Sequence, residues 1–301
     1  YMDRYSGRVN VTQKATDKLT VGMNSFFSLT KQGTPLTTAA YYSSPVAGSL
    51  FTPPSNPAKN ADGTWYDAIV GNNGVNFAAV YDYNDNNSKA YRQISSFFAQ
   101  YEFMPGLKFK TNTGIDFMNF NELDYDDPRS RGNTAFGIGR ATSSSSQVLN
   151  WTNTNTLTYE KSLNDVHNFD FLLGEEATSY TYQDVQAASE NFASYNLRQV
   201  ESGATPVTTY GSQSAYRFLS YFGRANYNYK NKYYLSGSFR RDGSSRFGKN
   251  NKYANFYSVG ASWRMSEEPF IKDNFSFVNT LQLRASYGTS GNSSIGYYAS
   301  Y

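Results

Sequence analysis

Hydrophobic and polar residues alternate with a period of two along much of this 301-residue chain. In the segment 107–117, Leu107 and Phe109 fall on one face of an extended strand, and Lys108 and Lys110 fall on the other. A helix would instead bring together residues three and four apart, and these segments lack that spacing. The alternation predicts antiparallel β-strands with one apolar and one polar face.

About ten such segments occur, each on the order of ten residues long, which is the length that a tilted strand needs to cross a membrane. A strand of a soluble protein has about five or six residues. The predicted strands span residues 5–13, 19–28, 93–103, 107–117, 147–159, 167–176, 216–229, 233–242, 255–265 and 280–289. Their length favours an all-β fold, an antiparallel transmembrane β-barrel.

The connections between these strands fall into two classes. Short turns lie at 14–18, 104–106 and 230–232, and long polar loops lie at about 29–92, 118–146 and 177–215. Outer-membrane barrels have short periplasmic turns and long extracellular loops. We therefore expect one end of the sheet in the periplasm and the other outside the cell.

Aromatic residues gather on the apolar face near the short-turn end. They are Phe103, Phe109, Tyr159, Tyr229, Tyr233 and Trp263. Aromatic girdles mark the membrane interfaces of such barrels, although these residue types are also good strand formers. Because other residues set the register independently, the girdle is the favoured interpretation.

Composition narrows the class of protein. Aromatic residues make up 17% of the chain, which excludes a disordered protein. The chain has no cysteine, which excludes a disulfide scaffold and a thiolate metal site. Its net charge of +3 is too small to indicate a nucleic-acid partner. No apolar run approaches the ~20 residues of a membrane helix, but a barrel strand needs apolar residues only at alternate positions.

No catalytic constellation emerges, so we expect no enzymatic activity and no cofactor. His167 is the only histidine, and no GxSxG motif accompanies it. One histidine without cysteine leaves no histidine-based metal cluster. The remaining metal candidate is a group of acidic residues, Glu122, Asp124, Asp126 and Asp127.

These carboxylates suit a hard cation such as calcium. They lack the spacing of an EF-hand loop, and Arg129 and Arg131 follow them. A solvated loop whose charges pair with one another is favoured over a metal site.

The long loop 29–92 is rich in aromatic residues. They are Tyr41, Tyr42, Trp65, Tyr66, Tyr81 and Tyr83. Aromatic faces beside amides and carboxylates suit sugars, whose C–H faces stack while their hydroxyls hydrogen-bond. The same side chains can instead pack the loop against itself, as in compact surface loops, and both interpretations stay open. A nucleic-acid groove would also need a cationic track, which this loop lacks.

Three arginines, Arg224, Arg264 and Arg284, fall on the polar face, which lines the lumen of a barrel. Each either pairs with a carboxylate of whatever fills the barrel or lies in water. The cationic run 239–253 lies between two predicted strands. It lacks the GxxxxGK[ST] spacing and the following helix of a phosphate-binding loop.

We interpret this run as an extracellular hairpin. In it, Asp242 and Gly243 would turn the chain, Arg240 would be directed inward, and Arg246 would lie at the tip.

The run RRDGSSRFGKNNKYANFYSVGASWRMSEEPFI, followed by LQLRASYGTSGN, closely resembles the SusC/RagA family of TonB-linked outer-membrane transporters. Residues 240–248, 258–270 and 281–292 follow the order of the family's motifs. The segments RYSGRVNVTQKATDKLTVG and ENFASYNLRQVESGA are also similar to the family. These motifs are structural and do not identify a substrate.

The resemblance implies a barrel of about 22 strands with an N-terminal plug, opened by the TonB–ExbB–ExbD system of the inner membrane. It also implies a SusD-like surface lipoprotein as partner, and uptake of oligosaccharides or peptides across the outer membrane. We assign residues 1–301 to a partial barrel domain, without the plug or the TonB box.

Two other hypotheses remain. A plug-free porin would share the barrel. A soluble β-rich adhesin or glycan-binding domain would instead pack its apolar face against a second sheet.

Overall fold

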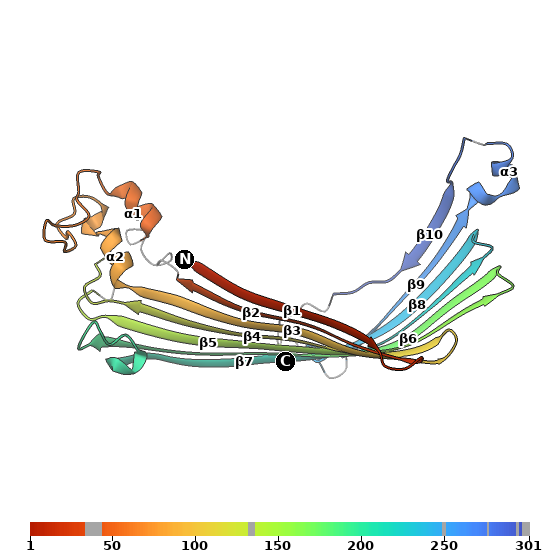
Figure 1. Ribbon diagram of the computed structural model, residues 1–301, viewed down its shortest axis with the longest axis horizontal. Coiled ribbons are helices and arrows are strands. Elements are labelled where there is room, and N and C mark those ends of the chain that lie inside the picture. Colours follow the sequence, from red (N-terminus) through yellow and green to blue (C-terminus); the bar gives the residue numbers. More distant parts are fainter. Residues whose placement is uncertain (34–43, 132–135, 249–250, 276, 293–294, 297–301) are drawn as a thin grey trace.

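The computed structural model describes residues 1–33, 44–131, 136–248, 251–275, 277–292 and 295–296. Ten strands form one antiparallel sheet in which each strand pairs with the next along the chain. They are β1 (Met2–Lys14), β2 (Leu19–Gly33), β3 (Asp85–Met104), β4 (Leu107–Asp126), β5 (Arg140–Leu163), β6 (His167–Phe192), β7 (Gly203–Tyr229), β8 (Tyr233–Ser244), β9 (Tyr253–Arg264) and β10 (Gln282–Gly288). Among the described residues β1 and β10 do not pair, so the sheet is a long, curved, open wall (Figure 1).

Short helices lie beyond the strands at both of their ends (Figure 1). The β2–β3 connection contains α1 (Pro45–Phe51), the 3₁₀ helix η1 (Asn72–Gly74) and α2 (Phe77–Tyr83). The other helices are η2 (Val200–Ser202), η3 (Met265–Glu267) and α3 (Pro269–Lys272). In the described part of the chain, none of the helices has the length and apolarity needed to span a membrane.

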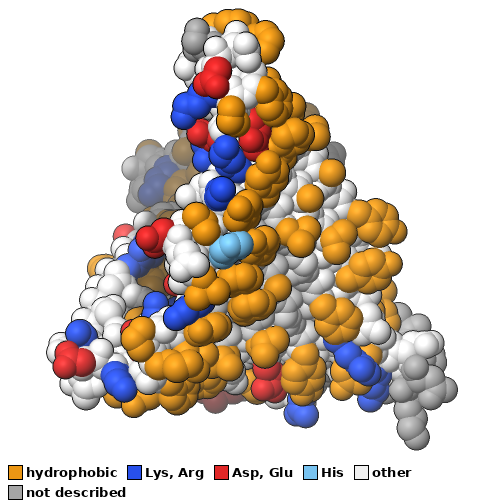
Figure 2. Space-filling view, turned by 90° about the vertical axis from the view of Figure 1, so that its right-hand side faces the viewer, with side chains coloured by type: hydrophobic (Ala, Val, Ile, Leu, Met, Phe, Trp, Pro, Cys, Tyr) orange, Lys and Arg blue, Asp and Glu red, His pale blue; other side chains and the backbone are white. Residues whose placement is uncertain are grey.

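One face of the sheet is apolar across its full width, because paired residues in neighbouring strands point the same way. A single row of paired residues runs from β2 to β9: Leu19, Tyr101, Phe109, Leu157, Leu173, Gly223, Phe239 and Tyr257. Most of these residues have exposed side chains, and Leu173 reaches 64%. Figure 2 shows hydrophobic side chains gathered in this way over the end of the wall that carries the short turns.

The expected aromatic girdle lies on this apolar face. The rings of Tyr229 and Tyr233 are 6.2 Å apart, and those of Tyr233 and Trp263 are also 6.2 Å apart. Phe103 packs edge-on against Tyr101 at 5.1 Å. Ring contacts thus link the girdle residues of β7, β8 and β9 near the short turns.

Five polar residues interrupt the apolar face on β4, β5 and β6. They are Thr111, Thr113, Asn153, Asn155 and Glu175, which are paired or neighbouring in the register. Asn153 Nδ2 donates to Thr113 Oγ1 at 2.8 Å, and Asn155 Nδ2 donates to Asn153 Oδ1 at 2.8 Å. Bonds within the patch thus satisfy amide groups for which lipid tails offer no partner.

The short turns lie where the sequence predicts them. In the β7–β8 turn, Lys230 and Asn231 have φ of 52° and 54°, and Asn164 and Asp165 in the β5–β6 turn both have 52°. Two consecutive residues at positive φ are typical of the type I′ turn, whose twist matches that of the flanking strands. Gly106 has φ 86°, and a Cβ there would lie 2.2 Å from the backbone oxygen of Glu160, so this turn requires glycine.

The predicted long loops were wrong in length. Strand β4 continues to Asp126 and β5 begins at Arg140, so most of 118–146 is strand. Likewise β6 continues to Phe192 and β7 begins at Gly203, within the predicted loop 177–215. Above the apolar band both faces of a strand meet water, so alternation disappears while the backbone ladder continues.

The fold has almost no conventional core. The one cluster of buried hydrophobic side chains in the described chain consists of Tyr125, Ala141 and Phe192, with Val200 packed against it, at the long-loop end. Elsewhere the sheet is held by its ladder of backbone hydrogen bonds and by lateral contacts on each face.

Replacing Leu173 by arginine in the full-length protein should lower its free energy of unfolding in a bilayer by about 2–4 kcal/mol, because the charge would face lipid tails. Leu172→Arg is the matched control: it places the same charge one residue away on the polar face and should cost far less. Urea titration of the protein in liposomes measures both. Equal losses for the two variants would contradict the assigned faces.

Candidate functional site

The connections at the long-loop end fold into one packed cluster rather than separate loops. Asn76 caps the N-terminus of helix α2: its Oδ1 accepts hydrogen bonds from the backbone N–H of Ala78 and Ala79. Asn84 follows the last residue of the helix, and its side chain joins the helix to the end of β4. Asn84 Oδ1 accepts from the Asp127 N–H at 3.0 Å, and its Nδ2 donates to Asp126 Oδ1 at 2.9 Å.

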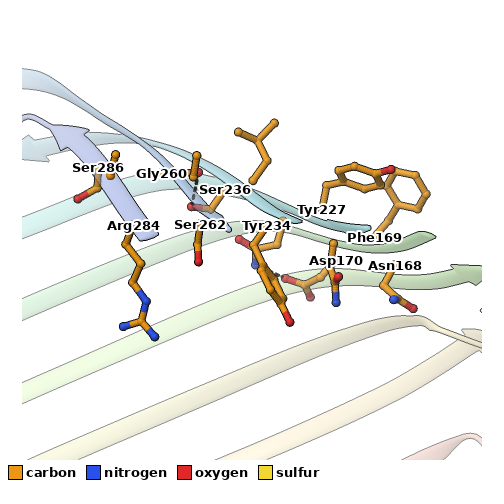
Figure 3. A pocket seen from close by; sticks show the side chains of 15 residues that line it. Asn168, Phe169, Asp170, Tyr227, Tyr234, Ser236, Gly260, Ser262, Arg284 and Ser286 are labelled. Atoms are coloured by element: carbon orange, nitrogen blue, oxygen red, sulfur yellow. Dashed lines mark hydrogen bonds between the residues drawn. The ribbon is translucent and has the colours of Figure 1, made fainter. Parts of the chain in front are cut away.

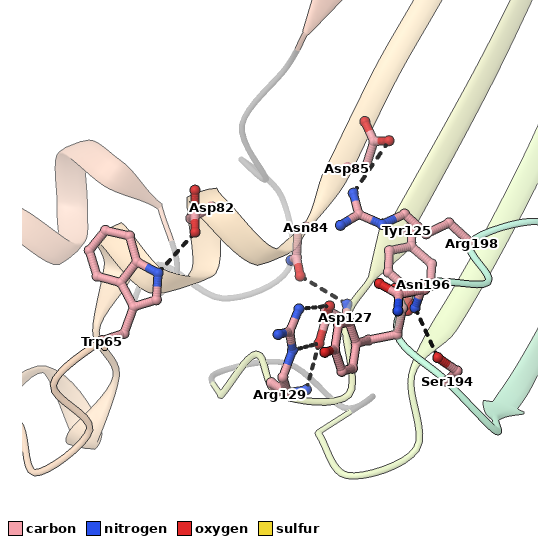
Figure 4. A network of polar contacts seen from close by, with 11 residues as sticks. Trp65, Asp82, Asn84, Asp85, Tyr125, Asp127, Arg129, Ser194, Asn196 and Arg198 are labelled. Carbon is pink, nitrogen blue, oxygen red and sulfur yellow. Dashed lines mark hydrogen bonds and ion pairs between the residues drawn. The ribbon is translucent and has the colours of Figure 1, made fainter. Parts of the chain in front are cut away.

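Asp127 and Arg129 form the centre of this cluster (Figure 4). The guanidinium of Arg129 donates two parallel hydrogen bonds to the Asp127 carboxylate, at 2.8 and 2.7 Å. The backbone N–H of Arg129 donates to the same carboxylate at 2.9 Å. Asp127 is completely buried. A buried carboxylate is tolerated only with charge pairing and hydrogen bonds of this kind.

Two tyrosines sandwich the Arg129 guanidinium. Its Cζ lies 4.3 Å from the ring centre of Tyr83, at the end of α2, and 3.7 Å from that of Tyr195, in the β6–β7 connection. The hydrogen bonds that Arg129 donates to Asp127 raise the pKa of Arg129 above its usual range. Arg129 therefore stays charged and ties together three connections that are distant in sequence.

A second arginine reinforces the junction. Arg198 lies 3.7 Å from the carboxylate of Asp85, the first residue of β3, and its guanidinium sits 5.5 Å from the ring centre of Tyr125. Tyr125 in turn packs edge-on against Phe192 at 5.5 Å. The cluster thus packs against the long-loop ends of β3, β4 and β6.

A cavity of about 270 Å³ lies beside this centre. Its walls include the aromatic residues Trp65, Tyr66, Tyr83 and Phe136 and the cations Arg129 and Arg131. Trp65 is held by a hydrogen bond from its Nε1 to Asp82 Oδ2 at 2.9 Å, and Lys59 covers its ring at 4.4 Å. The buried hydroxyl of Ser130, which also lines the cavity, has no hydrogen-bond partner among the described residues.

The structure brings together three of the aromatic residues singled out in the sequence, since Trp65, Tyr66 and Tyr83 line this cavity. Tyr81 does not line it and is 58% exposed. Tyr41 and Tyr42 lie outside the described residues. Trp65 and Tyr83 thus make packing contacts within the loop cluster and also line the cavity.

The acidic segment differs from the solvated loop expected from the sequence. Glu122 and Asp124 belong to strand β4, and Asp127 is buried rather than solvated. The self-pairing is present, because Asp127 binds Arg129. No group of acidic and histidine side chains suited to a metal ion is found in the described part of the chain.

The polar face carries ion pairs between neighbouring strands. Arg224 Nη2 lies 3.0 Å from Asp170 Oδ1, which also accepts from Asn226 Nδ2 at 2.7 Å. Arg92 forms two hydrogen bonds with Asp116, at 3.1 and 2.9 Å. These arginines are therefore paired within the wall itself.

The other two arginines predicted to face the lumen, Arg264 and Arg284, have partners of different kinds. Arg264 lies 3.5 Å from Glu267, in η3. Arg284 donates to the amide oxygen of Gln282 at 2.6 Å. In Figure 3, Arg284, Ser262 and Asp170 extend to one side of the sheet, and Phe169 and Tyr227 extend to the other. His167 belongs to the aromatic side, where its Nδ1 lies 2.8 Å from the Tyr227 hydroxyl.

The hairpin after β8 does not turn at Asp242 and Gly243 as predicted. Both residues are paired in the ladder, Asp242 with Ala254 and Gly243 with Tyr253, and the chain turns after Ser244. A Cβ on Gly243 would lie 2.5 Å from the Tyr253 ring, so glycine is needed for cross-strand packing. Gly243 was predicted to be a turn residue, but it lies within the β8–β9 pairing and leaves room for the Tyr253 ring.

The neighbouring charges are engaged on the polar face. Arg240 lies 2.6 Å from Asp242 and 3.4 Å from Glu176. Arg246, in the turn, covers the ring of Tyr216 at 4.0 Å. The hairpin charges thus fasten β8 to β6 and β7.

The protein-family model for the TonB dependent receptor-like β-barrel matches residues 9–301. The chain belongs to this family. TonB-dependent receptor P3 of Formosa agariphila is 34% identical over 99% of this chain and 30% of its own length. The receptor SusC of Bacteroides thetaiotaomicron is 28% identical over 65% of this chain and 19% of its own length.

Among solved structures, the RagAB peptide transporter matches with a TM-score of 0.81 and 27% identity, over 99% of this chain and 34% of that chain. The resemblance to the SusC/RagA type is thereby confirmed, and the open sheet is a wall segment of such a TonB-dependent receptor barrel. Barrels of this family are outer-membrane proteins. This chain spans about a third of the length of the P3 receptor and of the RagAB chain.

Removing the Arg129 side chain should loosen the whole cluster, because Asp127 would remain buried without its charge partner. We expect Arg129→Ala to destabilise the cluster locally by about 1–3 kcal/mol. Hydrogen exchange of α2 and of residues 127–131 in the full-length receptor measures the loss. Arg131→Ala is the control, since its exposed pair with Asp67 spans 3.8 Å and should contribute about 0–1 kcal/mol. Similar exchange in both variants would show that Asp127 does not depend on Arg129.

Proposed function

We propose that the full-length receptor imports oligosaccharides across the outer membrane, in a TonB-dependent manner, and that residues 1–301 are part of its barrel domain. One observation carries the proposal: a sheet of barrel-wall geometry, apolar on one face and charged on the other, in a chain that matches the receptor family over residues 9–301. An apolar face exposed over this many strands is suited to lipid. This arrangement favours an outer-membrane transporter over a soluble adhesin.

In this proposal the polar face lines the lumen, and the long-loop end meets the ligand outside the cell. The in-wall pairs of Arg224 and Arg92 neutralise part of the charge on this hydrophilic surface, along which a neutral sugar can move. Arg284, which donates to the neutral amide of Gln282, is available to meet a carboxylate of the plug. No covalent chemistry is needed for this transport.

Two partners belong to the proposal. A SusD-like surface lipoprotein would cover the long-loop end and deliver ligand, and the TonB–ExbB–ExbD system would move a plug located elsewhere in the full-length receptor. Support comes from the SusC/RagA motifs in residues 240–292 and from the similarity to SusC. A plug-free porin would share the wall and lack both partners.

The ligand class rests on the loop cavity. Its volume of about 270 Å³ and its aromatic walls fit a sugar ring, which stacks on Trp65 and hydrogen-bonds to the polar rim. A peptide is the second candidate, because the RagAB structure, 27% identical to this chain, is that of a peptide transporter. Binding of oligosaccharide and peptide libraries to the purified full-length receptor with its lipoprotein discriminates between them.

Trp65→Ala should weaken oligosaccharide binding by about fivefold to tenfold, close to the 1.4 kcal/mol that corresponds to a factor of ten. Trp65→Phe keeps an aromatic face and should recover most of the affinity. Tyr81→Ala, on the exposed side of α2, should change little. Isothermal titration calorimetry measures the affinities. Equal effects of Trp65→Ala and Tyr81→Ala would rule out the cavity as the sugar site, whereas failure to isolate any lipoprotein partner would count against the transporter itself.

A further inference from the structure

The connection between β9 and β10 is unlike the other turns at its end of the wall. The turns after β1, β3, β5 and β7 contain only a few residues, whereas this connection spans residues 265–281 and contains η3 and α3. In Figure 1 it projects beyond the ends of β8 and β9. Its described part carries three exposed aromatic residues, Phe270, Phe275 and Phe277.

Glu268 fastens this connection to the apolar side of the wall. Its Oε1 accepts a hydrogen bond from the Tyr233 hydroxyl at 2.6 Å and another from Trp263 Nε1 at 3.1 Å. Its Oε2 accepts from Lys232 Nζ at 3.5 Å. Tyr233 and Trp263 are paired girdle residues on the apolar face. The chain therefore leaves β9 and folds over the outer rim of the wall, not beneath its polar face.

The same contacts keep Glu268 ionised. The hydrogen bond from Tyr233, followed by that from Trp263, holds the pKa of Glu268 below its usual range, and Lys232 acts in the same direction. The neighbouring Glu267 pairs with Arg264 at 3.5 Å and Lys272 at 3.8 Å, so the charges around the connection are largely compensated. The charges of Glu267 and Glu268 are thus paired where the connection meets the apolar face.

The three phenylalanines continue the aromatic girdle. The ring of Phe270 lies 6.3 Å from that of Trp263, and Phe275 packs edge-on against Phe277 at 6.1 Å. Phe277 is 80% exposed, Phe275 45% and Phe270 49%. The Phe275 N–H donates to the Ile271 oxygen at 2.8 Å, which closes a turn after α3. Large apolar side chains so exposed next to a girdle are suited to the membrane interface.

We propose that Phe270, Phe275 and Phe277 form a foot that inserts into the phospholipid leaflet at the short-turn end, and that Glu268 is the latch that holds it there. The occupant is phospholipid because the foot is continuous with the apolar face and carries Lys272, an exposed cation beside apolar side chains. The foot would set the depth of this part of the wall in the membrane.

A spin label at position 277 of the full-length receptor in phospholipid nanodiscs tests the insertion. This part of the chain has no cysteine, so Phe277→Cys can be labelled after any cysteine elsewhere has been replaced. Asp273→Cys, on an exposed position of the same connection, is the matched control. Power-saturation measurements compare collisions of each label with oxygen, which concentrates in lipid, and with a water-soluble nickel chelate.

We expect the ratio of oxygen to nickel collisions to be several-fold higher at 277 than at 273. High nickel access at 277 would place the foot in water and overturn the proposal. Low access to both reagents would mean that another part of the receptor covers it, which also overturns it.

The latch is tested in the same preparation. Glu268→Ala should lower the ratio at 277 toward that of water. Glu267→Ala should leave it unchanged, because the ion pairs of Glu267 are with Arg264 and Lys272 and not with the girdle rings. Glu268→Gln, which keeps an acceptor for Tyr233 and Trp263, should lie between them and serves if the alanine variant does not fold. An unchanged ratio in both Glu268 variants would refute the latch.

Discussion

The backbone hydrogen-bond ladder is the constraint on which this structure depends. In a hydrocarbon phase no water can satisfy an N–H or C=O group, so each strand must pair along its whole membrane-crossing length. The chain meets this demand with nine successive antiparallel pairings and almost no buried core. The buried cluster of Tyr125, Ala141 and Phe192 lies beyond the apolar band, at the long-loop end. Side-chain packing is therefore local, and the ladder supplies the continuity.

The ladder also explains how one sheet serves two environments. Period-two geometry sends Leu173 to the apolar face and Leu172 to the polar face, so the same strand meets both lipid and a charged lining. Where polar residues fall on the apolar face, as at Asn153 and Thr113, they bond to one another. The edge strands β1 and β10 present backbone groups unpaired within the described chain, so closure requires further strands.

The sequence predicted the strands and short turns well in the half of the wall near the short turns. There the contact with lipid requires apolar residues at alternate positions. The prediction failed above the band: β6 continues to Phe192 through residues whose two faces both meet water. Helix α2 had a readable signal in Asn76, an N-cap before an apolar run, which the polar surroundings obscured. The bond of Asp127 to Arg129, by contrast, depends on Tyr195 and Asn84 arriving from distant connections, so no local pattern could reveal its burial.

Beyond the strand ends the ladder no longer fixes the chain. There a carboxylate, Asp127 at the long-loop end and Glu268 at the short-turn end, holds the neighbouring groups in place. At one end Asp127 holds Arg129 between two tyrosine rings, and at the other Glu268 accepts hydrogen bonds from Tyr233 and Trp263. In both places a carboxylate accepts hydrogen bonds that orient aromatic or planar groups. The charge can remain buried or near lipid only while every partner is present. Order at the two ends of the wall therefore rests on a few specific polar contacts, whereas order within it is spread along nine strand pairings.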